Sequence, residues 1–165
     1  MKDIVPIERK KFDSYEDFRI KAASNFFPDE SLPSAVGEKY YHYSVDFDRQ
    51  SAVSFQLEEE AYEEQKQKYV EEMGKWIEEG HAGIHIYLWD EGEPRKVTKE
   101  FMEAEDLMFV DNVCSKDLEE YSCVFDYKSE MSNGFSTRGI ICNDETKELI
   151  FYLYHDNGLF GVGDA

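Results

Sequence analysis

The sequence predicts a single α+β domain over residues 1–165, with a mostly antiparallel sheet of about five or six strands and a long amphipathic helix (about 58–80) packed on one face. Apolar residues recur at the helical period between 58 and 80, and in several shorter stretches they alternate with polar residues at the strand period. Runs of strands separated by helices, rather than strict alternation of the two, favour α+β over a doubly wound fold.

The first regular element expected is a short helix over about 14–26. Residues 1–12 include a proline and are interpreted as an irregular or edge segment. Ser14 and Asp17 are close to a capping box, which starts a helix, and Pro28 ends it because the residue before a proline disfavours helical geometry.

A β-hairpin is expected to follow this helix. Alternation over 39–47 and 53–57 predicts its two strands, with a turn at 48–51. We expect Tyr41 to face the core, which places Tyr40 on the outer face of the same strand.

The central helix is predicted from one apolar stripe and one charged face. The stripe consists of Tyr62, Tyr69, Val70, Met73, Trp76 and Ile77, which recur at steps of three, four or seven residues. Residues 58–80 also carry nine acids and three lysines, mostly on the other face. Gly80 provides a C-terminal stop.

The second half of the chain is expected to be mainly sheet. Residues 84–89 alternate as a strand, and Thr98 can cap a short helix near 98–105. Three antiparallel strands then form a meander, over 121–127, 135–142 and 148–155, with a turn at Asn133-Gly134. The glycine-rich tail, about 156–165, is expected to be mobile.

Composition excludes some classes of partner. The net charge is −19, with 37 acidic against 18 basic residues, whereas binding to a nucleic-acid backbone or an anionic membrane needs clustered Lys and Arg. We find neither a signal peptide nor an apolar stretch long enough for a membrane span. Three cysteines without close spacing favour a reducing cytoplasm.

The sequence shows no catalytic, cofactor or metal signature, so we expect no enzyme activity and no cofactor. His81 and His85 are four residues apart but are flanked by glycines and a strand pattern, unlike the helical zinc motif. No local signature marks Cys114, Cys123 or Cys142 as a nucleophile, and Cys123 reads as a small buried residue. With 37 acids, chance carboxylate pairs are uninformative.

The charge and the aromatic residues together predict a protein-binding surface. Residues 58–80 and 90–120 hold most of the excess negative charge, and an aromatic pair precedes an acidic turn. The candidate binding residues are Glu71, Glu72, Glu78, Glu79, Tyr87, Trp89, Asp90, Glu91 and Glu93. The simpler alternative is that the acids only keep the protein soluble and that both faces of the sheet are covered.

Two functional hypotheses follow. In size, acidity and lack of motifs the chain resembles small acidic immunity proteins and antitoxins, as well as protein mimics of nucleic-acid charge. The resemblance implies a non-enzymatic protein that docks or neutralises a basic protein such as a toxin. The alternative is a small enzyme or small-molecule-binding domain with a pocket between sheet and helix. The oligomeric state is left open.

Overall fold

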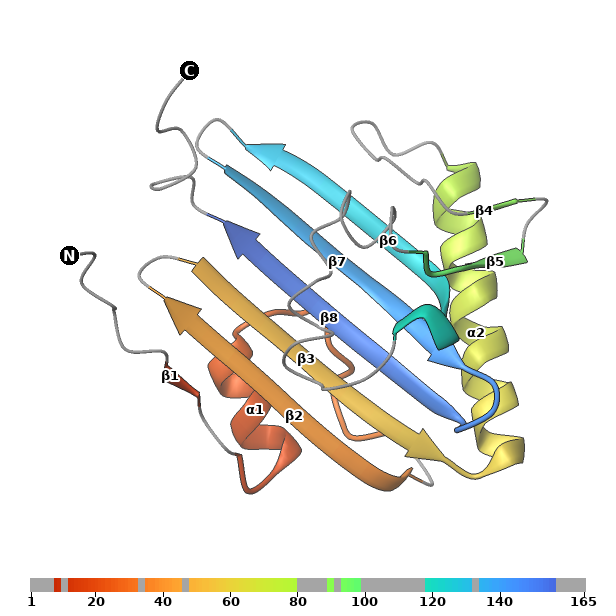
Figure 1. Cartoon of the computed structure of the whole chain (residues 1–165), viewed down its shortest axis with the longest axis horizontal. Helices are drawn as coiled ribbons and strands as arrows, with labels where there is room; N and C mark the ends of the chain where they lie inside the picture. Colours follow the sequence, from red (N-terminus) through yellow and green to blue (C-terminus); the bar gives the residue numbers. More distant parts are fainter. Residues whose placement is uncertain are drawn as a thin grey trace.

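A computed structural model describes residues 8–9, 12–32, 35–45, 48–79, 89–90, 93–98, 118–131 and 134–156. Over these residues the chain is an α+β fold with one antiparallel sheet (Figure 1). The elements in chain order are β1 (Glu8–Arg9), α1 (Tyr15–Ala22), β2 (Ala35–Val45), β3 (Asp48–Leu57), α2 (Glu59–Glu78), β4 (Trp89–Asp90), β5 (Glu93–Lys96), the 3₁₀ helix η1 (Leu118–Glu120), β6 (Ser122–Met131), β7 (Gly134–Asn143) and β8 (Glu148–Asp156).

The sheet has the strand order β1-β2-β3-β8-β7-β6-β5-β4. The predicted β2–β3 hairpin and β6–β7–β8 meander are both present, and β8 joins them by pairing with β3. These five strands are each nine to eleven residues long. The described sheet exceeds the five or six strands expected because β1, β4 and β5, of two to four residues, extend its edges.

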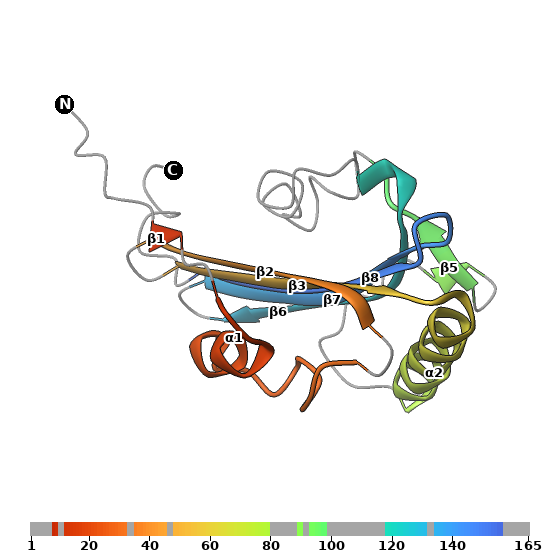
Figure 2. The ribbon, with the colours of Figure 1, turned by 90° about the horizontal axis from the view of Figure 1, so that it is seen from below.

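Both α-helices cover the same face of the sheet, whereas η1 lies on the opposite face (Figure 2). Alternation along β8 shows the two environments: Leu149 and Phe151 pack toward the helices, while Ile150 and Tyr152 pack on the other side with Leu118 of η1. Side chains of successive strand residues point to opposite faces, so β8 contributes to both cores. Its four residues named here are all buried.

The predicted central helix is present as α2, which spans 20 residues and packs against β3, β6 and β8. Tyr62 and Tyr69 of the predicted stripe are buried, and Val70 packs against the same core. The side chains of Met73, Trp76 and Ile77, and the stop at Gly80, lie outside the described residues.

Helix α1 starts as predicted but ends early. The Ser14 side chain accepts a hydrogen bond from the Asp17 backbone N–H, which caps the first turn. The helix stops at Ala22 rather than near 26, because Ala23 adopts a left-handed conformation while its N–H still donates to the Arg19 carbonyl. Phe26 is therefore outside the helix, although it packs against the same core.

Two predictions about the first hairpin are wrong. The turn is not at 48–51: Asp48 already pairs with Val45, so only residues 46–47 lie between β2 and β3. Tyr40 does not face outward, since it is partly buried and its ring stacks on Phe18 of α1 at 5.7 Å. Its partner in the register, Val53, lies on the same helix-covered face.

Several predicted segments lie outside the described residues. These are the strand residues 84–88, the helix near 98–105 beyond Thr98, the tail after Asp156 and most of the N-terminal segment. Within that N-terminal segment, Glu8 and Arg9 form the edge strand β1. In the described part of the chain, no helix has the length and apolar character needed to cross a membrane.

Candidate functional site

The outer face of α2 is strongly acidic. At 100° per residue, its apolar residues Tyr62 and Tyr69 occupy one side, and most of the glutamates fall on the other. All nine acids between 58 and 79 are exposed, namely Glu58, Glu59, Glu60, Glu63, Glu64, Glu71, Glu72, Glu78 and Glu79. Burial of the tyrosine side thus turns the acids toward solvent.

The turn between β7 and β8 is attached to the first half of α2. The Tyr62 hydroxyl donates to Asp144 Oδ1 at 2.6 Å, and Lys66 Nζ lies 2.7 Å from the same oxygen. Burial acts to raise the pKa of Asp144, but hydrogen bonds from Lys66 and Tyr62 outweigh it and hold the pKa below its usual value. Lys147 reaches Glu59 at 3.5 Å.

A small hollow joins this turn to η1. It has a volume of about 360 Å³ and is lined by acids from both segments, Glu119 and Glu120 of η1 and Asp144 and Glu145 of the turn, beside Lys96. Negative charge therefore continues from α2 across the β7–β8 turn to η1, at the same end of the molecule (Figure 1).

We call this region the acidic end, defined by residues 58–79, 119–120 and 144–147 together with Lys96. It carries thirteen exposed acids against five lysines. The other described charged side chains that are not buried number six acids, on or near α1 and β2, and five bases. The described surface charge is thus concentrated at one end and almost balanced elsewhere.

The predicted binding residues are only partly placed. Glu71, Glu72, Glu78 and Glu79 are exposed on α2. Trp89 and Asp90 form β4 and Glu93 begins β5, but their side chains lie outside the described residues, as do Tyr87 and Glu91 entirely.

Sequence reasoning missed the acids of the β7–β8 turn and the adjoining Lys147. These residues follow no periodic pattern, and their composition indicates only a turn. Their proximity to α2 arises because β8 pairs with β3, the strand that leads into α2. No local signal in the sequence indicates that pairing.

A groove lies on the helix-covered face, between segment 23–32, α2 and strands β7 and β8. We call it the helix-side groove; its volume is about 940 Å³. Aromatic side chains from three elements line it, Phe26, Tyr69 and Phe151, together with the polar side chains Gln65, Lys68 and Arg138. Its described lining includes neither histidine nor cysteine.

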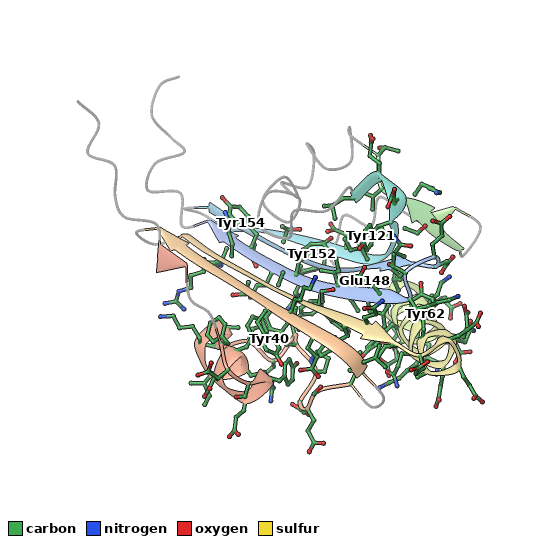
Figure 3. All side chains as sticks on the ribbon, turned by 60° about the horizontal axis from the view of Figure 1, so that its bottom comes forward. Tyr40, Tyr62, Tyr121, Glu148, Tyr152 and Tyr154 are labelled. Carbon is green, nitrogen blue, oxygen red and sulfur yellow. The ribbon has the colours of Figure 1, made fainter. Side chains whose placement is uncertain are left out.

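The opposite face of the sheet holds two buried carboxyl groups, Glu148 and Asp126, each hydrogen-bonded to a tyrosine. Figure 3 labels Glu148 with Tyr121 and Tyr152. Glu148 accepts hydrogen bonds from Ser54 at 2.8 Å and from Tyr121 at 3.2 Å. Asp126 accepts from Tyr152 and, at 3.4 Å, from Thr137. Hydrogen bonds of this kind offset the cost of burying polar groups, so both side chains fit a role in holding β3, β6, β7 and β8 together.

The two cysteines that the structure describes are packed inside the fold. Cys123 and Cys142 are buried, one on each face of the sheet, which confirms the prediction that Cys123 is buried. Burial raises the pKa of the Cys142 thiol, which disfavours the reactive thiolate. Among the described residues, no group of three or more His, Cys, Asp or Glu is placed to hold a metal ion.

No protein-family model, curated protein or solved structure matches the chain. The function is therefore argued from these surfaces alone.

Proposed function

We propose that the protein is a non-enzymatic binding protein whose acidic end docks a protein with a basic surface, in the manner of an immunity protein or antitoxin. The single observation that carries the proposal is the separation of charge: thirteen exposed acids against five lysines at one end, and near balance over the rest of the described surface. If the acids served solubility alone, no such concentration would be needed.

The arrangement suits electrostatic steering. A surface of one sign raises the association rate of a partner of opposite sign by a factor of about 10 to 10³. Glu71, Glu72, Glu78 and Glu79 are exposed on a helix that is held by its buried tyrosines. A rigid support of this kind presents the charges without an ordering cost to the backbone.

We further propose a cytoplasmic location. Cys142 is a free thiol, as is usual in reducing compartments. The basic partner would meet the protein there.

The test uses two charge-reversed variants with equal changes in net charge. The first replaces Glu71, Glu72, Glu78 and Glu79 by lysine at the acidic end. The second, the matched control, replaces four exposed acids on or near α1, Asp13, Glu16, Asp17 and Glu30, by lysine. Each variant and the wild type are used to capture proteins from the native cell at about 0.01 M salt, where the Debye length is about 30 Å.

We expect the wild type and the control variant to capture a protein rich in Lys and Arg. The acidic-end variant should fail to capture the same protein. Its association rate, measured by stopped flow, should fall at least about tenfold with the acidic-end variant and decline as salt is raised. Equal loss of rate with both variants would show that net charge, and not the acidic end, governs binding. Equal retention by all three proteins would refute the docking surface.

A further inference from the structure

The helix-side groove contains a cation with no anionic partner among the described residues, in a chain with about twice as many acids as bases. Arg138 stands two residues before Ile140 on β7, so its side chain points to the helix-covered face. Its guanidinium carbon lies 4.8 Å from the centre of the Tyr127 ring and 5.9 Å from that of Phe26. Within the described part of the chain, the guanidinium makes no hydrogen bond or ion pair.

The groove also offers an apolar, aromatic wall. Phe151 is buried, and its ring meets Tyr69 edge-on at 5.2 Å and Phe26 at 6.3 Å. All three rings line the groove. Aromatic ligands pack well on such walls, because ring edges and faces are electrostatically complementary.

Two further polar side chains of the groove, Lys68 and Gln65, indicate which chemical groups a ligand would carry. Lys68 lines the groove from α2, with its ammonium 5.3 Å from the centre of the Tyr69 ring. Gln65 lines the same wall, and its side-chain carbonyl oxygen is buried with no described hydrogen-bond donor. A buried acceptor of this kind is satisfied by a donor on a ligand.

The acids around the groove do not remove its preference for an anion. Asp29 is bound to Arg19, 3.0 Å away. Glu30 and Glu72 are exposed, where water screens them. Arg138 is half-buried against two rings and presents a planar fork of donors that fits a carboxylate bidentately.

We propose that the helix-side groove binds a small aromatic carboxylate. Its ring system packs on Phe26, Tyr69 and Phe151, its carboxylate pairs with Arg138 supported by Lys68, and a ring N–H or O–H donates to Gln65. The volume of about 940 Å³ is within the range of ligand pockets. Of the thirteen acids of the acidic end, Glu72 is the one in the described lining of the groove, so this proposal concerns a largely different surface and goes beyond the docking function.

Three indole compounds that share one ring system test the chemistry. Indole-3-acetate carries the carboxylate, indole-3-ethanol is neutral and tryptamine is cationic. Each is titrated into the full ¹⁵N-labelled chain while amide chemical shifts are followed. A ligand of this size at ordinary efficiency has a Kd of about 1 mM. We expect indole-3-acetate to bind most tightly and to shift the amides of segment 23–32, Tyr69 and Arg138.

Variants test the assigned residues. Arg138→Gln should weaken indole-3-acetate binding about tenfold or more while affecting indole-3-ethanol little, as expected for loss of a charge-assisted pair. Lys68→Gln should weaken it less, whereas Lys75→Gln, on the same helix but outside the groove lining, should leave it unchanged. Asn25→Trp, at an exposed lining position, should block all three compounds.

The proposal is overturned if none of the compounds shifts the groove amides up to several times the expected Kd. It is also overturned if the neutral or cationic compound binds as tightly as the acid, or if Lys68→Gln and Lys75→Gln are indistinguishable. Should Arg138→Gln fail to fold, by circular dichroism, Lys68→Gln and Asn25→Trp still decide the outcome because both positions are exposed.

Discussion

Replacing Asp144 by alanine is expected to destabilise the fold by about 2 kcal/mol, because one carboxylate oxygen joins the β7–β8 turn to α2. Tyr62 is fully buried, and its hydroxyl donates to Asp144 Oδ1 at 2.6 Å. Without that acceptor the buried hydroxyl is left with the Cys142 thiol, a weak hydrogen-bond partner, and loss of the carboxylate costs about 1–3 kcal/mol. The partly exposed ion pair with Lys66 adds less than about 1 kcal/mol.

Tyr62→Phe removes the donor of the same hydrogen bond and is expected to cost about 1 kcal/mol. Because each substitution removes one shared interaction, the double variant should be about 1 kcal/mol more stable than the sum of the single losses predicts. Urea unfolding followed by circular dichroism gives the four free energies of unfolding. Glu145→Ala, at the exposed neighbouring position, is the control and should change stability by less than about 0.5 kcal/mol.

The effect of pH has a defined sign. The folded pKa of Asp144 lies below its ordinary value of 3.8, so the unfolded chain binds the proton more readily. The stabilisation is therefore fully present above pH 3.8 and is lost as pH falls through the lowered folded pKa. The difference in stability between the wild type and Asp144→Ala should shrink over that acidic range and be unchanged between pH 6 and 8.

Additive losses in the double-mutant cycle would refute this reasoning, since they would mean that Tyr62 and Asp144 act independently. A stability difference that persists undiminished in acid would equally exclude the charged carboxylate as the stabilising group.

Three further predictions concern backbone, tyrosine and thiol. Ala23→Gly should raise the free energy of unfolding by about 0.5–1 kcal/mol, because Ala23 ends α1 at a φ of 50° that glycine adopts without strain; Ala61→Gly inside α2 should lower it by about as much. Burial, with a smaller contribution from Glu72, raises the pKa of Tyr69 to about 12. The stabilisation by the neutral phenol is therefore present below the ordinary pKa of 10.0 and is lost as pH rises toward 12. Tyr69→Phe should reduce this alkaline loss of stability, measured by urea unfolding at a series of pH values. In a Cys114→Ser background, Ellman's reagent should modify the remaining thiols only at the rate of unfolding, since both are buried; rapid modification of folded protein would contradict the packing.

The regular elements could be predicted from the sequence wherever one face of an element is buried. The meander followed from alternation and from the turn at Asn133-Gly134, and β7 begins at that glycine. The face on which Tyr40 lies could not be predicted in this way. Alternation shows which residues share a face of a strand, but the helices that select the covered face pack from elsewhere in the chain.

The candidate site was predictable only where it is local. The acids of α2 are close in sequence, and their exposure follows from burial of Tyr62 and Tyr69. The contribution of Asp144 depends on the pairing of β8 with β3, which joins residues about one hundred positions apart. The ligand-binding role proposed for Arg138 similarly depends on its position beside Phe26, which is more than one hundred residues away in the sequence.

Both edges of the sheet end in strands of only two residues, β1 and β4. β1 pairs with β2 over two residues, and β5 pairs with β6 over two residues, so most of the outer edge of each long strand has no strand partner among the described residues. Long open edges of this kind can pair with another extended polypeptide. Molecules that carry many like charges also repel one another at low ionic strength. Repulsion between the acidic chains therefore opposes pairing through the open edges of β2 and β6, and this protection is expected to weaken as salt is raised.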